Sequence, residues 1–156
     1  MSEKNNVIRL VVDGNNDESC FIEKIILGYN EYEELDIIKL RAIIKDVEYT
    51  NSKEFTEMEL AIFDLQKQLP NNMQIVCCLT CKHGTFCPYG NAENEIFCLI
   101  HHSPKDKMDV AAIFSAWAQR KVELQKNELL YWCDMYSKIS ENDYSYTDWH
   151  YYLDNR

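Results

Sequence analysis

The stretch MQIVCCLTCKHGTFCPYGNAENEIFCLI, residues 73–100, decides the fold that we expect for this chain. Its ends, MQIVCCL (73–79) and NEIFCLI (94–100), are short apolar runs of the kind that form buried β-strands. PYGN (88–91), between them, has the residues of a tight backbone reversal. The sequence therefore predicts two strands joined by a cysteine-rich turn.

Runs of β-branched and aromatic residues nearer the N-terminus predict three more strands. VIRLVV (7–12) and CFIEKIIL (20–27) are two of these runs, and the polar DGNNDES (13–19) between them predicts a loop. DIIKLRAIIKDVEYT (36–50) mixes alternation with paired apolar residues. This pattern predicts one long strand that twists or bulges.

A first helix is indicated by apolar residues at helical spacing, and Pro70 marks its end. Its start is predicted by a capping box of Thr56 with Glu59, or by an earlier one of Asn51 with Glu54. The apolar residues are Met58, Ala61, Ile62, Leu65 and Leu69.

A second helix is predicted after Ser103, Pro104 and Asp106, which supply an N-cap, a first-turn proline and a capping carboxylate. In the aromatic tail, Thr147 or Asp148 is a candidate cap for a short final helix. The buried stripe expected for the second helix is Val110, Ile113, Phe114 and Trp117.

Length and composition are those of one ordinary domain. The 156 residues, of which 46% are hydrophobic, suffice to bury a core, and we expect a single domain over residues 1–156. The predicted elements define an α+β fold with a mainly antiparallel sheet, two principal helices and a cysteine-clustered turn.

The formal net charge of −10 limits the kind of partner. Gripping nucleic acid phosphates needs a basic face, so we expect no nucleic acid partner and a preference for basic proteins. The first residues lack the long apolar core of a signal peptide, and no apolar stretch is long enough to span a bilayer. A cytoplasmic protein without a membrane partner is expected, with its seven cysteines reduced.

Cys78 and Cys81 form a C-x-x-C pair, which is half of a tetrahedral zinc cage. We expect the other half from Cys98 on the next strand and from Cys133 in YWCDMY. The substitutes are Cys87, His83 and His101. Free cysteine is also among the most buried residue types, so inert packing with no cofactor stays equally open beside structural zinc.

Catalytic uses of these cysteines are disfavoured. KHGTFCPYG (82–90) has Gly and Pro where the helix of a redox C-x-x-C would begin, and the zinc deaminase and zinc protease motifs are absent from the sequence. The cysteine spacing differs from the tight run of a ferredoxin iron–sulfur site. None of the four glycines belongs to a phosphate-binding loop. No motif orients a Cys–His pair for nucleophilic catalysis. We therefore expect a protein that is not an enzyme.

CLTCKHGTFCPYGN (78–91), EIFC (95–98) and CDMYSKISENDYSYTDWHYYL (133–153) together resemble a bacterial cysteine-rich family. Its members share a C-x-x-C turn, a Pro-x-Gly corner, a later cysteine and a Cys–aromatic tail, and they resemble immunity partners of secreted or contact-delivered toxins. The resemblance covers residues 76–153 and implies Cys78, Cys81, Cys98 and Cys133 as the recurring thiols. It also implies that this chain binds and neutralises a toxin.

Two acidic clusters in the first half are the partner-binding residues that we expect for a basic, nuclease-type toxin domain. They are Asp13, Asp17 and Glu18, and Glu31, Glu33, Glu34 and Asp36. An ordinary solvated surface also explains each cluster. The alternative functions are a small structural zinc-binding or thiol redox protein; a zinc-dependent nucleic-acid module is opposed by the net charge.

Overall fold

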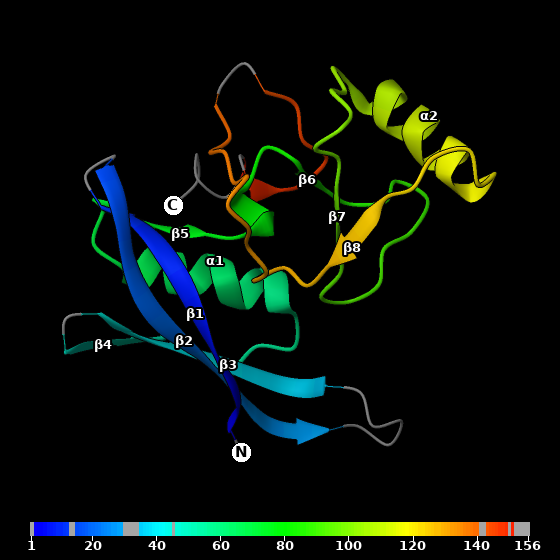
Figure 1. Ribbon diagram of the computed structural model, residues 1–156. Helices are drawn as coiled ribbons and strands as arrows, with labels where there is room; N and C mark the ends of the chain where they lie inside the picture. Colours follow the sequence, from blue (N-terminus) through cyan, green and yellow to red (C-terminus); the bar gives the residue numbers. More distant parts are fainter. Residues whose placement is uncertain are drawn as a thin grey trace. The chain divides into compact units, whose positions relative to one another are not determined.

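The computed structural model describes residues 2–12, 15–29, 35–44, 46–140, 143–149 and 151, and side chains from residue 37 onward within these ranges. It divides into two compact units, Met1–Val76 and Cys77–Arg156, which are described separately (Figure 1). Folding of both units as one domain stays a prediction.

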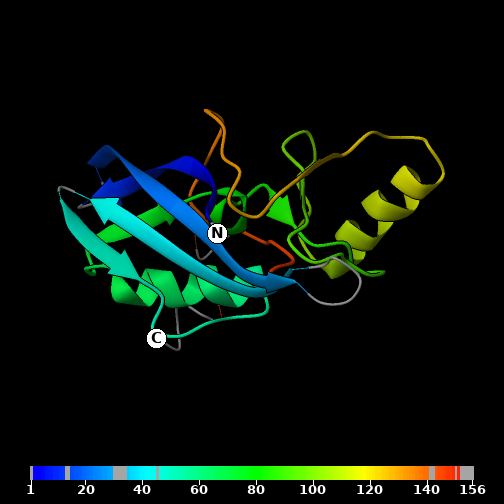
Figure 2. The same ribbon diagram turned by 90° about the horizontal axis from the view of Figure 1, so that it is seen from below.

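The Met1–Val76 unit is a five-stranded antiparallel sheet with one helix against it (Figures 1 and 2). The strand order is β4-β3-β2-β1-β5. The bounds are Ser2–Val12 for β1, Asn15–Tyr29 for β2, Leu35–Ile44 for β3, Val47–Thr50 for β4, Met73–Val76 for β5 and Met58–Gln68 for α1. Figure 2 shows α1 running along one face of the sheet.

The strands predicted at 7–12 and 20–27 are confirmed, but the predicted loop is wrong at residues 15–19, which are part of β2. Val12 pairs with Asn15, so only residues 13 and 14 connect the two strands. Antiparallel pairing is made by backbone groups, and polar side chains do not interrupt it. The polar residues 15–19 therefore belong to β2.

The single strand predicted at 36–50 is also wrong, because the stretch folds into the β3–β4 hairpin. Ile44 pairs with Val47, and Asp46 has a φ of 65°. Asp tolerates this left-handed conformation better than most residues, and its presence in a two-residue connection is a turn signal. The apolar pattern continued across the turn and concealed it.

Helix α1 confirms the first predicted helix without either capping box. Its N-cap is Glu57, which makes no side-chain capping hydrogen bond. At the other end Leu69 is extended, with φ −80° and ψ 152°, as the following Pro70 requires. The predicted apolar residues are buried against the sheet: Met58, Ala61, Ile62, Leu65 and Leu69.

Asn51 joins the sheet to α1 through its buried side chain. Its Oδ1 accepts a hydrogen bond from the backbone N–H of Leu40 at 2.7 Å, and its Nδ2 donates to the carbonyl of Ala61 at 2.8 Å. The same Nδ2 donates to Asp64 at 3.0 Å. The residue considered as an early helix cap thus serves as a link between β3 and α1.

Asn51→Ala should lower the free energy of unfolding by about 2–3 kcal/mol, because it leaves the buried N–H of Leu40 without an acceptor. Ser52→Ala is the control: it removes only an exposed hydrogen bond to Asp64 and should cost less than about 1 kcal/mol. Denaturant unfolding measures both. Equal losses in the two variants would contradict the role of Asn51.

The Cys77–Arg156 unit contains a three-stranded antiparallel sheet of order β6-β7-β8 and the second helix. The bounds are Cys78–Thr80 for the 3₁₀ turn η1, Gly84–Thr85 for β6, Ile96–Cys98 for β7, Lys107–Ala118 for α2 and Gln125–Asn127 for β8. The strands expected at 73–79 and 94–100 are thus shorter than predicted. The first ends at Val76, where the cysteine turn begins.

Helix α2 packs on β7 through aromatic contacts. The rings of Phe97 and Phe114 meet edge to face with their centroids 5.0 Å apart. Val110 and Phe114 are buried as predicted, whereas Trp117 is 38% exposed. The N-cap is Asp106 rather than Ser103, since Asp106 Oδ1 accepts from the N–H of Asp109 at 2.8 Å.

The two helices and the antiparallel sheets confirm the α+β fold. Neither α1 nor α2 is long and apolar enough to cross a membrane, and the rest of the described chain has no such helix. The short final helix predicted after Thr147 or Asp148 falls mostly on residues outside the described ranges.

Candidate functional site

The cysteine turn begins with the 3₁₀ turn η1. Thr80 stabilises it from inside: its Oγ1 accepts from the N–H of Cys77 at 3.2 Å, and its own N–H donates to the carbonyl of Cys77 at 3.1 Å. The N–H of Cys81 then donates to the carbonyl of Cys78 at 3.3 Å. Side chains three residues apart in a 3₁₀ turn lie on the same side, so Cys78 and Cys81 face one space.

Cys98 reaches this space through the pairing of β6 with β7. Gly84 is the pairing partner of Cys98, and the N–H of Leu99 donates to the carbonyl of His83 at 2.8 Å. The backbone immediately after Cys81 is therefore held against the strand that carries Cys98.

Cys133 reaches the same space on a loop that runs beside the cysteine turn. The N–H of Cys78 donates to the carbonyl of Tyr131 at 2.7 Å, and that of Lys82 donates to the carbonyl of Ser137 at 2.8 Å. These hydrogen bonds fix the loop on both sides of Cys133.

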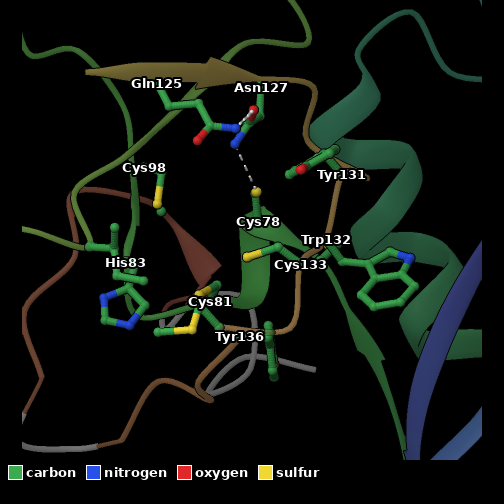
Figure 3. A pocket seen from close by; sticks show the side chains of 14 residues that line it. Cys78, Cys81, His83, Cys98, Gln125, Asn127, Tyr131, Trp132, Cys133 and Tyr136 are labelled. Atoms are coloured by element: carbon green, nitrogen blue, oxygen red, sulfur yellow. Dashed lines mark hydrogen bonds between the residues drawn. The ribbon is translucent and has the colours of Figure 1, made fainter. Parts of the chain in front are cut away.

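The result is a pocket of about 60 Å³ lined by thiols (Figure 3). Figure 3 shows Cys78, Cys81, Cys98 and Cys133 around one space, with His83 at its edge. Cys77 also lines the pocket. The four cysteines expected as metal ligands are thus brought together. Of the substitutes, only His83 lines this pocket: His101 is exposed, and Cys87 packs against the cluster of Phe97, Val110 and Phe114.

Burial favours the protonated form of three of the pocket thiols. It raises the pKa of Cys77 to about 11 and that of Cys78 to about 12, and it also raises the pKa of Cys98. A nucleophilic cysteine needs the opposite shift. Chemistry at a free thiolate of these three residues is therefore disfavoured near neutral pH.

His83 does not form a Cys–His pair with these thiols. Burial lowers the pKa of its imidazole, and among the described residues no hydrogen bond joins that ring to a thiol. The polar contact made to a pocket sulfur comes instead from Asn127, whose Nδ2 donates to Cys78 Sγ at 3.6 Å. Nothing in the sequence pattern pointed to Asn127, because it comes from a short, polar edge strand.

The cysteine side chains are not arranged as a finished metal site in this structure. Across the described ranges, no group of three or more His, Cys, Asp and Glu side chains stands in place to hold a metal ion. The six cysteines with described side chains are all free thiols. The pocket gathers the expected ligands, and the metal itself stays a prediction.

The acidic residues expected to bind a partner are only partly described. Asp13, Glu31, Glu33 and Glu34 lie outside the described residues. Of the others, Asp17 and Glu18 are near the start of β2, whereas Asp36 is beside the residues that pair with Gly28 and Tyr29 near its end. The backbone therefore places Asp17 and Glu18 near one end of β2 and Asp36 near the other.

Comparison with known protein families, curated proteins and solved structures finds no match to this chain. The resemblance to toxin-associated immunity proteins therefore stays a prediction.

Gly84→Ala should lower the free energy of unfolding by about 3 kcal/mol, because a Cβ at residue 84 would lie 2.1 Å from the carbonyl oxygen of Cys78. Gly90→Ala is the comparison: that residue has a φ of 132° but open space around it, so its cost of about 1–2 kcal/mol is only backbone strain. Denaturant unfolding of both variants measures the difference. A Gly84→Ala protein as stable as the parent would contradict the close approach.

Proposed function

We propose that this chain acts by binding another protein, and that its thiol-lined pocket braces the scaffold. The proposed partner is a basic toxin domain that the interaction neutralises, which is the function that the resemblance implies. The raised thiol pKa values and the absence of a His83–thiol hydrogen bond within the described part support a role without turnover.

Tyr89 is the observation that carries the proposal. Its side chain is 67% exposed, yet its hydroxyl is fixed on α2 by a hydrogen bond with Ser115 Oγ at 3.0 Å and a second to the carbonyl of Ala111 at 3.3 Å. Aromatic side chains supply much of the binding energy at protein interfaces, and a pre-positioned ring loses little conformational freedom on binding. An exposed, anchored tyrosine is therefore suited to serve as a contact.

The side of α2 beside Tyr89 extends this contact surface. Met108 is 80% exposed, and Ala112, one helical turn further on, is also exposed. Both lie away from the buried Val110 and Phe114. Met108 and Ala112 thus add two exposed apolar side chains on the side of α2 beside Tyr89.

The charge of the chain supports a basic partner. At −10, the protein attracts basic proteins at long range and repels acidic ones. Attraction of this kind raises the rate of association, while apolar contacts such as Tyr89 slow dissociation. A basic toxin domain satisfies both requirements.

Co-expression with the product of the adjacent reading frame tests the function. If that product is a toxin, this chain should restore growth and co-purify with it. Glu33→Lys with Glu34→Lys should reduce the association rate about tenfold while far-UV circular dichroism stays unchanged, because the second acidic cluster loses its attraction. A toxin that is neither bound nor relieved, or a purified chain that turns over a small compound, would overturn the proposal.

Tyr89→Ala should weaken binding of the same partner about 30-fold, the loss expected when a central aromatic contact is removed. Tyr151→Ala is the matched control, since Tyr151 is 65% exposed and belongs to neither α2 nor the corner that carries Tyr89. Calorimetric titration measures both affinities. Equal effects of the two substitutions would remove Tyr89 from the interface.

A further inference from the structure

We infer that the pocket binds one zinc ion through the thiolates of Cys78, Cys81, Cys98 and Cys133. The inference does not depend on the proposed partner, because metal content and partner binding are measured separately. It begins from the convergence of η1, β7 and the loop after β8 on one space. Cysteines that only pack in a core can be buried singly, so a packing role does not by itself require several of them to meet in one pocket.

The positions of Cys77 and Cys87 exclude them as zinc ligands and leave these four cysteines. Cys77 is fully buried, whereas the other four cysteines of the pocket each retain some exposure. Cys87 lies outside the pocket, against the aromatic cluster. Four half-buried or buried thiols remain in the pocket, which is the number that a closed tetrahedral zinc site uses.

One of the four sulfurs already has a hydrogen bond of the kind that supports a metal-bound thiolate. Asn127 Nδ2 donates to Cys78 Sγ at 3.6 Å. Donors in this position orient a ligand and stabilise its negative charge, and they are a regular part of metal sites. A protonated thiol that only packs in the core does not require such hydrogen-bond donors.

The volume of the pocket and the chemistry of its thiol groups favour a single metal ion over an organic ligand. A space of about 60 Å³ is well below the roughly 300–1,000 Å³ of pockets for organic ligands. Thiolates prefer zinc to magnesium or calcium, which take oxygen ligands. A single soft or borderline cation is therefore the occupant that fits.

In the proposed site, rotation of the cysteine side chains would bring the sulfurs together around the metal. The described sulfurs do not yet form a cage, but each cysteine has one side-chain torsion with three staggered positions. The backbone hydrogen bonds of Cys78, Lys82 and Leu99 already fix the segments that carry the ligands. On binding, four thiols release four protons to the solvent and form four Zn–S bonds.

The test uses the full-length chain, purified without a histidine tag from zinc-supplemented cells. Elemental analysis should find about one zinc per chain, and cobalt(II) should give the absorption of a tetrahedral four-thiolate complex. Each of Cys78→Ser, Cys81→Ser, Cys98→Ser and Cys133→Ser should weaken zinc binding at least about 100-fold, and Asn127→Ala about tenfold. Cys87→Ser, the matched control, should bind zinc like the parent.

Wild-type measurements keep the inference testable if a cysteine variant fails to fold. Removing zinc with a chelator should lower the melting temperature of the parent, and adding zinc back should restore it. Absence of zinc and of a cobalt–thiolate spectrum in the parent would overturn the inference. A three-thiolate spectrum, or loss of zinc in His83→Ala, would overturn the four-thiolate assignment, and neither result would bear on partner binding.

Discussion

The pocket depends on the backbone pairing that holds residues 129–138 beside residues 78–82. The N–H groups of Cys78, Leu79 and Lys82 donate to carbonyls of that later segment, and Cys81 bridges to Lys138. Bringing together two segments so far apart in sequence costs conformational entropy. Burial of Leu79, Leu129, Leu130 and Ile139 offsets this cost. Cys133 is therefore positioned by its neighbours' backbone and not by its own side chain.

The type of a strand or helix was predictable from its apolar pattern, whereas its ends were not. Met58 to Leu69 and Val110 to Phe114 show the helical period, and residues 7–12 show the strand composition. The two strand errors in the first half arose at hairpin connections of two residues. At residue 46 the turn lies inside a continuous pattern, and at residues 15–19 strand pairing includes a polar run. At both places the strand ends are determined by backbone pairing, which cannot be read from residue composition.

The four cysteines that line the pocket were named from the sequence, whereas the residues around them were not. The C-x-x-C pair of Cys78 and Cys81 is a local signal, since one 3₁₀ turn places both side chains on the same side. Cys98 followed from the expected strand after the turn. The positions of Cys133 and Asn127 depend on long-range pairing, and the anchoring of Tyr89 depends on packing of the corner against α2. Sequence spacing contains neither kind of information.

The described acidic residues near the two ends of β2 are too far apart to act as one charged patch. Glu18 and Gly28 are ten residues apart on β2, which corresponds to about 30 Å of strand, and Asp36 lies beside the residue that pairs with Gly28. Charges separated by more than the Debye length of about 8–10 Å are largely screened from each other at physiological salt. An interface of ordinary size covers about 800 Å² of each partner, which is a patch roughly 30 Å across. In the proposed complex, an interface centred on Glu18 would therefore leave Asp36 at or beyond its edge, where a charge affects the rate of encounter more than the lifetime of the complex.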